Sequence, residues 1–262
     1  MRLGQIKWNG ATTAAIFNHV SARPIPDYTL YDLICRAEKE NRPLAALAEE
    51  LAIPRQEPAE PLIPLQPREV WGCGETYQAA NGDRPHIFFK GTARVCVGPG
   101  QSIGIRSDSR FTAAEPELAV VLGARGKILG YTLANDVSAQ DLARENPHFH
   151  AQAKTFQASC ALGPVMVTAD ELGDPRDLVV SCTVMRGGET IFAGEVSTAQ
   201  LGRSVEALVG FLMRSNPVPA GSVLLTGTGI AIGEEPALEA GDSVTIRADE
   251  IGELTNRVAV VG

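Results

Sequence analysis

The stretch FTAAEPELAVVLGARGKILGYTLANDVSAQ, residues 111–140, brings acidic residues to the ends of two apolar runs. Glu115 and Glu117 open the first run, and Asp136 closes the second. The segments ELAVVLG and KILGYTLAND predict two strands joined by a tight turn, because Gly126 accepts the positive φ that such a turn needs. Charges at the end of a buried strand are costly unless something pairs with them.

The register of this hairpin decides where the carboxylates lie. If Arg125 and Gly126 form a two-residue loop, then Glu115 lies opposite Asp136 and Glu117 lies one pair further in. Cross-strand partners share a face, and so do residues two apart along a strand. The three carboxylates are then on one face, about 5–7 Å apart. An odd-length loop or a bulge would turn Asp136 away, so the prediction depends on the turn.

Three carboxylates at such distances repel each other, unless some hold protons or a cation lies among them. Oxygen ligands favour hard ions, which predicts Mg²⁺, Mn²⁺ or Ca²⁺. The alternative is a solvated strand end with Glu117 facing water. Two observations favour a metal: Lys154 in QAKTF follows shortly and can balance negative charge, and small residues surround the acids. These small residues are Ala113, Ala114, Ala134, Ser138 and Ala139.

The bulk composition excludes several classes of protein. The chain has 262 residues, 44% hydrophobic and 21% charged, which is typical of a globular protein. Its net charge of −8 argues against nucleic-acid binding. No apolar run approaches the ~20 residues of a membrane helix, and the N-terminus lacks the apolar core of a signal peptide. The five cysteines form no C-x-x-C motif, so we expect structural thiols in the cytoplasm and no membrane partner.

The first 66 residues predict a small α/β domain. Short strand-like runs come first, and a helix follows with Asp27 as its expected N-cap. A second helix opens at Pro43. The apolar stripes of these helices are Leu30, Leu33, Ile34 and Ala37, then Leu44, Leu47, Ala48 and Leu51. Five prolines between positions 54 and 67 predict an extended linker, so we place the domain boundary near Pro67.

Residues 67–262 predict a larger, mostly β domain of short apolar runs punctuated by glycine. One helix interrupts them, STAQLGRSVEALVGFLMRS, with Ser197 or Thr198 as its cap. Its apolar face is Leu201, Val205, Leu208, Val209 and Leu212. The predicted fold class is therefore α+β, mostly β.

Three further features are weaker candidates. The glycines of TGTGIAIG do not have dinucleotide-binding spacing, so Thr228 belongs either to a loop facing a carboxylate-bearing ligand or to a plain turn. His148 and His150 share a strand face if extended, but a surface loop is the favoured interpretation over a metal site. His86 precedes an apolar pair. It is interpreted either as a core or edge histidine or as a candidate general base.

Several motifs in order resemble the fumarylacetoacetate hydrolase family. EPELAVVLG, GYTLANDVSAQD, AKTF and LGP match its central segment, and GSVLLTGTG with LEAGDSVTIRADEIGELTNRV matches its C-terminal signature. The resemblance implies a β-sandwich roll wrapped on a helix, a small N-terminal domain and a homodimer. It also implies a divalent ion on Glu115, Glu117 and Asp136, with Lys154 beside it and Thr228 in a substrate-facing loop.

Within the family, IRSDSRFTAAEPEL, ENPHFHAQAKTF and SCALGP are most similar to the members that dehydrate 2-keto-3-deoxy-D-arabonate. Two departures are visible. Gln140 stands where the motif VSARD has arginine, which removes a cationic contact to substrate. The segment between CGETYQ and RPHIFFKG is too short for the usual lid helix, and His86 stands where the dehydratases have glutamate. We expect no long lid over residues 78–88, and an open site partly walled by a dimer partner.

The predicted function is a metal-dependent dehydratase of a 2-keto-3-deoxy sugar acid, giving a dioxo acid such as 2,5-dioxopentanoate. Lys154 would take a proton from C3, His86 would protonate the departing 4-hydroxyl, and Ser138, Gln140 and Thr228 would hold the substrate. One alternative is a hydrolase or decarboxylase of acylpyruvate-type 2,4-dioxo acids on the same site. Another is a non-catalytic 2-oxo-acid binder, which the short lid and Gln140 suggest.

Overall fold

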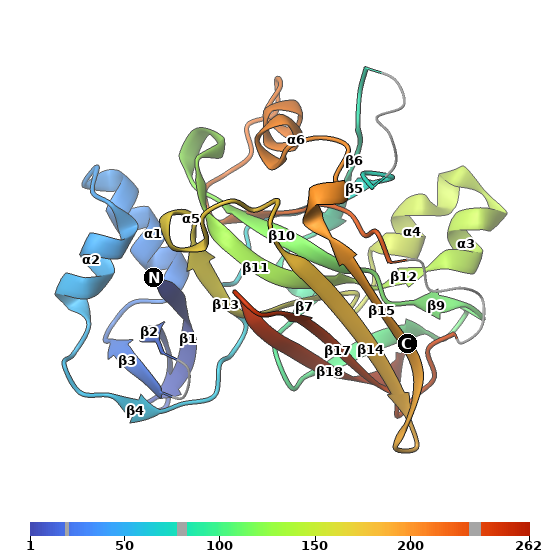
Figure 1. Cartoon of the computed structure of the whole chain (residues 1–262), viewed down its shortest axis with the longest axis horizontal. Helices are drawn as coiled ribbons and strands as arrows, with labels where there is room; N and C mark the ends of the chain where they lie inside the picture. The colour runs from blue at the N-terminus through green and yellow to red at the C-terminus, as the bar shows by residue number, and fades with distance from the viewer. Residues whose placement is uncertain (19–20, 78–82, 231–236) are drawn as a thin grey trace.

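The computed structural model describes residues 1–18, 21–77, 83–230 and 237–262. Within these ranges the chain is mostly β, as the sequence predicted, and two mixed sheets pack on each other (Figure 1). The two N-terminal helices lie at one end of the molecule, and α3 and α4 lie at the other (Figure 1). No helix in the described part is long and apolar enough to span a membrane.

The larger sheet contains eleven of the described strands and joins the N-terminal part to the rest. Its order is β4-β3-β2-β1-β13-β11-β10-β16-β5-β6, with β7 paired to β13. These strands are β1 (Arg2–Trp8), β2 (Ala11–Phe17), β3 (Ser21–Ile25), β4 (Glu57–Pro58), β5 (Val70–Gly74), β6 (His86–Gly91), β7 (Cys96–Val97), β10 (Pro116–Leu122), β11 (Ile128–Asp136), β13 (Cys160–Thr168) and β16 (Ser222–Leu225).

The second sheet has the order β15-β14-β17-β18-β8. It consists of β8 (Ser102–Arg106), β14 (Val179–Arg186), β15 (Glu189–Ser197), β17 (Ser243–Ala248) and β18 (Gly252–Val261). A two-stranded pair, β9 (Thr112–Ala113) and β12 (Ser138–Ala139), flanks the hairpin of β10 and β11. The helices are α1 (Leu30–Lys39), α2 (Leu44–Leu51), α3 (Gln140–Glu145), α4 (His150–Lys154), α5 (Ala169–Leu172) and α6 (Val205–Leu212), with 3₁₀ turns η1 (Ala93–Val95), η2 (Ala124–Gly126), η3 (Pro147–Phe149) and η4 (Thr198–Gln200).

Strand β10 is buried on both faces, and its alternate residues enter two different cores. Leu118 and Val120 pack in the cluster that the second sheet shares. Ala119 and Val121 pack in the cluster that includes α1 and α2. Because side chains alternate across a strand, Glu117 is on the second of these faces, at the strand end. A strand covered on both sides gives its terminal carboxylate little access to water.

The first helix confirms the predicted apolar stripe but corrects its cap. Thr29, and not Asp27, is the N-cap of α1: its hydroxyl accepts from the backbone N–H of Asp32, and the Asp32 carboxylate accepts from Thr29 N. This reciprocal capping box satisfies two helix-terminal donors, which Asp27 alone cannot do. Asp27 instead has a φ of 66° in the preceding turn.

The helix predicted from Ser197 onward is shorter in the structure. Ser197 caps only the 3₁₀ turn η4, and the α-helix begins after Ser204, whose hydroxyl accepts from Ala207 N. The Gly202 N–H donates to Thr76 O, a long-range bond that replaces the helical one. The predicted apolar residues are nevertheless buried, so the periodicity identified the face and missed the start.

The proline-rich segment packs against the N-terminal strands. Its β4 pairs with β3, and Leu62 N donates to Gln5 O. Strand β1 pairs with β13 through Leu3 and Met166, so residues 1–66 share the large sheet. That residues 1–66 form a separate domain from 67–262 stays a prediction.

Candidate functional site

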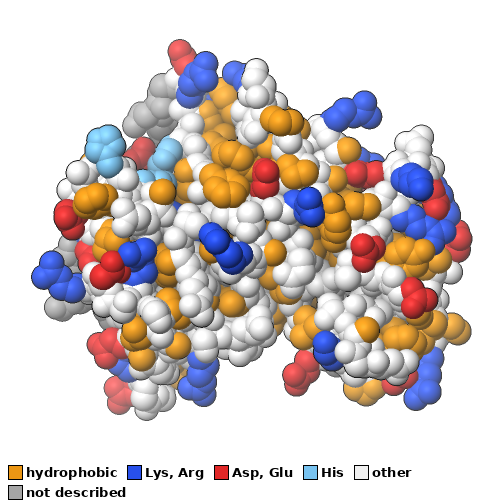
Figure 2. Space-filling model, turned by 180° about the vertical axis from the view of Figure 1, so that it is seen from behind, with side chains coloured by type: hydrophobic (Ala, Val, Ile, Leu, Met, Phe, Trp, Pro, Cys, Tyr) orange, Lys and Arg blue, Asp and Glu red, His pale blue; other side chains and the backbone are white. Residues whose placement is uncertain are grey.

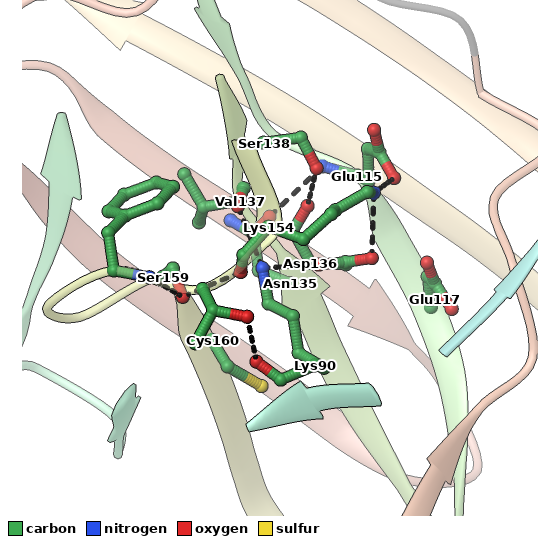
Figure 3. Close-up of polar contacts among 12 residues, drawn as sticks. Lys90, Glu115, Glu117, Asn135, Asp136, Val137, Ser138, Lys154, Ser159 and Cys160 are labelled. Atoms are coloured by element: carbon green, nitrogen blue, oxygen red, sulfur yellow. Dashed lines mark hydrogen bonds and ion pairs between the residues drawn. The ribbon is translucent and has the colours of Figure 1, made fainter. Parts of the chain in front are cut away.

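The β10–β11 hairpin places the three acidic residues as the sequence predicted. Glu117 pairs with Ala134, and the Asp136 N–H donates to Glu115 O at 2.9 Å. One oxygen of each of the three carboxylates lies within 4.8 Å of the others. Figure 3 shows these carboxyl groups on the same side of the hairpin.

The turn that joins the strands differs from the prediction, yet the register is the same. The loop is the three-residue η2 (Ala124–Gly126), not a two-residue loop. One extra loop residue shifts the pairing by one position. A β-bulge shifts it back, because Val121 pairs with Gly130 whereas Leu122 pairs with Ile128. The two departures cancel before the strand reaches the acidic residues.

The carboxylates form a buried site that fits a cation. Glu117 and Asp136 are buried, and Glu115 is partly buried. Glu117 Oε2 accepts from Gly227 N, but Oε1 has no hydrogen-bond partner among the described residues. Burial, and then the charges of Asp136 and Glu115, raise the pKa of Glu117 well above its usual range. A hard divalent ion would use the free oxygen and remove the repulsion.

Two lysines approach the same carboxylates. Lys154 Nζ lies 2.7 Å from Glu115 Oε2 and 2.8 Å from Asp136 Oδ2. Lys90 Nζ lies 2.5 Å from Asp136 Oδ1 and donates to Val137 O at 2.9 Å. Two ammonium groups face three carboxylates, so the third acid must either hold a proton, as the raised pKa of Glu117 indicates for the metal-free protein, or share a cation with the other two.

These ion pairs set the charge states of the centre. Burial alone would raise the pKa of Asp136, but Lys154 and Lys90 outweigh burial and lower it. Burial alone would lower the pKa of Lys154, but Asp136 and Glu115 outweigh burial and raise it. Without a cation the Lys154 ammonium is therefore the charge that bridges the two carboxylates. A role of Lys154 as a base needs the neutral amine, and we predict that the charge of a bound ion would favour that form.

Lys90 is the site residue that sequence reasoning missed. It is fully buried, although lysine is among the residues most rarely buried without a partner. A signal was present: in HIFFKG, Lys90 shares a strand face with His86 and Phe88. That pattern predicts a charged residue beside two rings, but it does not show which acid the lysine meets.

The residues predicted to hold the substrate lie around the acidic cluster. Gln140 Nε2 donates to Glu115 Oε1, so the residue that replaces the family arginine contacts a carboxylate of the cluster. Ser138 is buried, and its hydroxyl donates to Asp136 O at 2.8 Å. Thr228 follows Gly227, the donor to Glu117, and its hydroxyl accepts from Ile230 N at 3.2 Å. Their substrate contacts stay predictions.

The histidines need one correction. His148 is exposed, in agreement with the surface interpretation, but it lies in η3 and not in a loop. His150 opens α4, is half-buried, and lies 5.2 Å from His86 between ring centroids, so a surface loop was wrong for this residue. His86 is exposed on β6 beside Phe88. Residues 78–82 of the predicted open entrance lie outside the described residues, so the missing lid stays a prediction.

Comparison with known proteins agrees with this geometry. Residues 70–259 match the family model described as fumarylacetoacetate (FAA) hydrolase C-terminal, and the chain belongs to this family. It is 42% identical over 217 residues to a 2-dehydro-3-deoxy-D-arabinonate dehydratase of Saccharolobus solfataricus, covering 74% of this chain and 73% of the relative. It is 38% identical to a probable 2-keto-3-deoxyxylonate dehydratase of Haloferax volcanii, covering 76% and 75%.

A solved structure is also similar over the whole length. It is 2-keto-3-deoxy-D-arabinonate dehydratase complexed with magnesium and 2,5-dioxopentanoate. The TM-score is 0.84 at 35% identity, and the match covers 100% of this chain and 99% of that one. The family and the fold that the sequence motifs implied are thereby confirmed.

Proposed function

We propose that this protein is a metal-dependent dehydratase that converts a 2-keto-3-deoxy sugar acid into a dioxo acid such as 2,5-dioxopentanoate. The observation that carries the proposal is the buried cluster of Glu115, Glu117 and Asp136, with its partnerless Glu117 oxygen and two lysines. The similar dehydratases, one of them in complex with magnesium and 2,5-dioxopentanoate, support this substrate class.

The three carboxylates would hold Mg²⁺, or Mn²⁺ or Ca²⁺, since all their ligand atoms are oxygens. When bound, the ion would act as a Lewis acid toward the C1 carboxylate and C2 oxygen of the substrate. The protein's own contribution is to keep the cluster dry and fixed. Lys90 holds Asp136 from behind, Gln140 holds Glu115, and Gly227 N holds Glu117.

Proton movement is assigned to Lys154 and His86. Lys154 Nζ takes the proton from C3, and the 4-hydroxyl leaves as water with a proton from His86. The resulting C3=C4 alkene loses a proton from C5 and regains one at C3, which gives the C4=C5 enol. The enol then becomes the C5 aldehyde. Ser138, Gln140 and Thr228 hold the polar groups of the substrate.

The test is a turnover assay with Mg²⁺ on a panel of 2-oxo acids, following aldehyde and pyruvate together. We expect conversion of a 2-keto-3-deoxypentonate to 2,5-dioxopentanoate, and loss of that activity with a chelator. Pyruvate release from an acylpyruvate, with no dehydration of any sugar acid, would instead assign the protein to the hydrolases.

We also infer that the enzyme is a cytoplasmic homodimer or higher homo-oligomer, on the basis of its family resemblance. In a dimer, the partner subunit would form part of the wall of the open site. Light scattering on the purified chain tests this directly: a mass of twice 27.8 kDa or a higher multiple is expected, and a monomer at assay concentrations would contradict it.

A further inference from the structure

A row of side chains runs outward from the acidic cluster along β6 and α4. On β6, Lys90, Phe88 and His86 share one face because they are two residues apart. On α4, Lys154 and His150 are four apart and share one side of the helix. Lys90 and Lys154 meet at Asp136, so this is the inner end of the row.

Contacts between the two elements continue to the surface. Lys154 Nζ lies 5.1 Å from the centroid of the Phe88 ring. The Phe88 and His150 rings meet edge to face at 4.8 Å, and His150 and His86 follow at 5.2 Å. The order is therefore ammonium, aromatic ring and imidazole pair. Figure 2 shows histidine side chains gathered on the part of the surface where α4 and β6 lie.

Glycines on β5 leave the space that the outer rings occupy. Gly72 pairs with Phe88, and Gly74 pairs with His86. A Cβ added at Gly72 would lie 2.4 Å from the Phe88 ring, and one at Gly74 would lie 2.5 Å from His86 Nδ1. The rings thus lie over bare backbone, and any larger residue at either glycine would push them away.

Both imidazoles are available for a ligand. Within the described part of the chain, no hydrogen bond is made by the side chain of His150 or of His86. Burial, followed by the charges of His86 and Lys154, lowers the pKa of His150. A neutral imidazole both donates and accepts one hydrogen bond, which suits a hydroxyl group.

We propose that His150 binds the terminal hydroxyl of the substrate and makes the site selective for 2-oxo acids with a hydroxylated chain. The inference rests on the proposed function, because that function places the 2-oxo acid end at the carboxylates. The carbon chain then extends along Phe88 toward the imidazole pair. His150, whose ring meets Phe88 edge to face, serves the 5-hydroxyl at the end of this chain. A site built to bond a hydroxyl rejects the analogue that lacks it.

The test is calorimetric binding, with Mg²⁺ present, of two acids that differ only in the terminal oxygen. These are 5-hydroxy-2-oxopentanoate and 2-oxopentanoate, neither of which has a 4-hydroxyl to eliminate. The unmodified protein should prefer the hydroxylated acid about tenfold, the effect of one net hydrogen bond. His150→Phe should lose this preference, and His150→Gln, which keeps a donor and an acceptor, should retain part of it. His148→Phe, at an exposed neighbour, should leave it unchanged.

The outcomes separate this inference from the proposed function. Equal weakening of both acids in His150→Phe would indicate a packing role and overturn the inference, as would an unchanged preference. Loss of preference in a protein that dehydrates no sugar acid would support hydroxyl binding while the proposed function fails. Binding of neither acid by the unmodified protein would overturn both. In turnover, His150→Phe should raise KM about tenfold with kcat nearly constant, whereas His86→Phe should lower kcat.

Discussion

The β10–β11 hairpin and strand β6 each bring charged residues to the same centre, but only the placement of the hairpin residues could be predicted from the sequence. In the hairpin, Glu117 and Asp136 are 19 positions apart, and one turn connects them. Lys90 on β6 contacts Asp136 on β11 although β5, β16 and β10 lie between these two strands in the sheet order. Local register carries information over one turn, whereas sheet order depends on pairings between distant segments.

The largest effect is expected at Lys154, where both regions meet. Lys154→Ala removes the proposed base and the ammonium that bridges Glu115 and Asp136. General bases contribute about 10²–10⁴-fold, so we expect dehydration to fall by about a thousandfold or more. Steady-state assays with saturating Mg²⁺ measure this. Retention of a tenth of the activity would show that Lys154 is not the general base.

Lys90→Met tests how much the ion pair that β6 makes with the hairpin contributes to the stability of the protein. The change leaves Asp136 buried without its second ammonium, and breaking a buried ion pair costs about 3–5 kcal/mol. Urea unfolding of the metal-free protein should show this loss, and Mg²⁺ should restore part of it by supplying positive charge. Lys127→Met, at an exposed lysine, is the control. Equal stability of the two variants would show that the Lys90 pair contributes nothing.

The sequence predicted that Glu115, Glu117 and Asp136 lie together with Lys154 nearby, and it predicted the mostly β class and the apolar faces of α1, α2 and α6. It reached the correct register with the wrong turn, because the three-residue loop and the bulge cancel. It placed the start of α6 wrongly since Gly202 bonds to Thr76, which is far away in the chain. His150 was assigned to the surface for the same reason: its contact with His86 arises only when α4 packs beside β6.

The smallest effect concerns the corrected helix start. Thr29→Ala removes the hydroxyl that accepts from Asp32 N, and loss of an N-cap costs about 1 kcal/mol. Asp27→Asn should change stability less, because asparagine also accepts the positive φ found there. Thermal unfolding of both variants compares them. A larger loss of stability for Asp27→Asn than for Thr29→Ala would indicate that Asp27 is the N-cap.

The most direct test of the central claim is a calorimetric titration of the metal-free chain with Mg²⁺. Because Glu115, Glu117 and Asp136 share one centre, we predict one ion per chain and severe weakening in Glu117→Gln, which removes a charged ligand. Glu115→Gln and Asp136→Asn should weaken binding as well. Unchanged affinity in all three single variants would contradict the site.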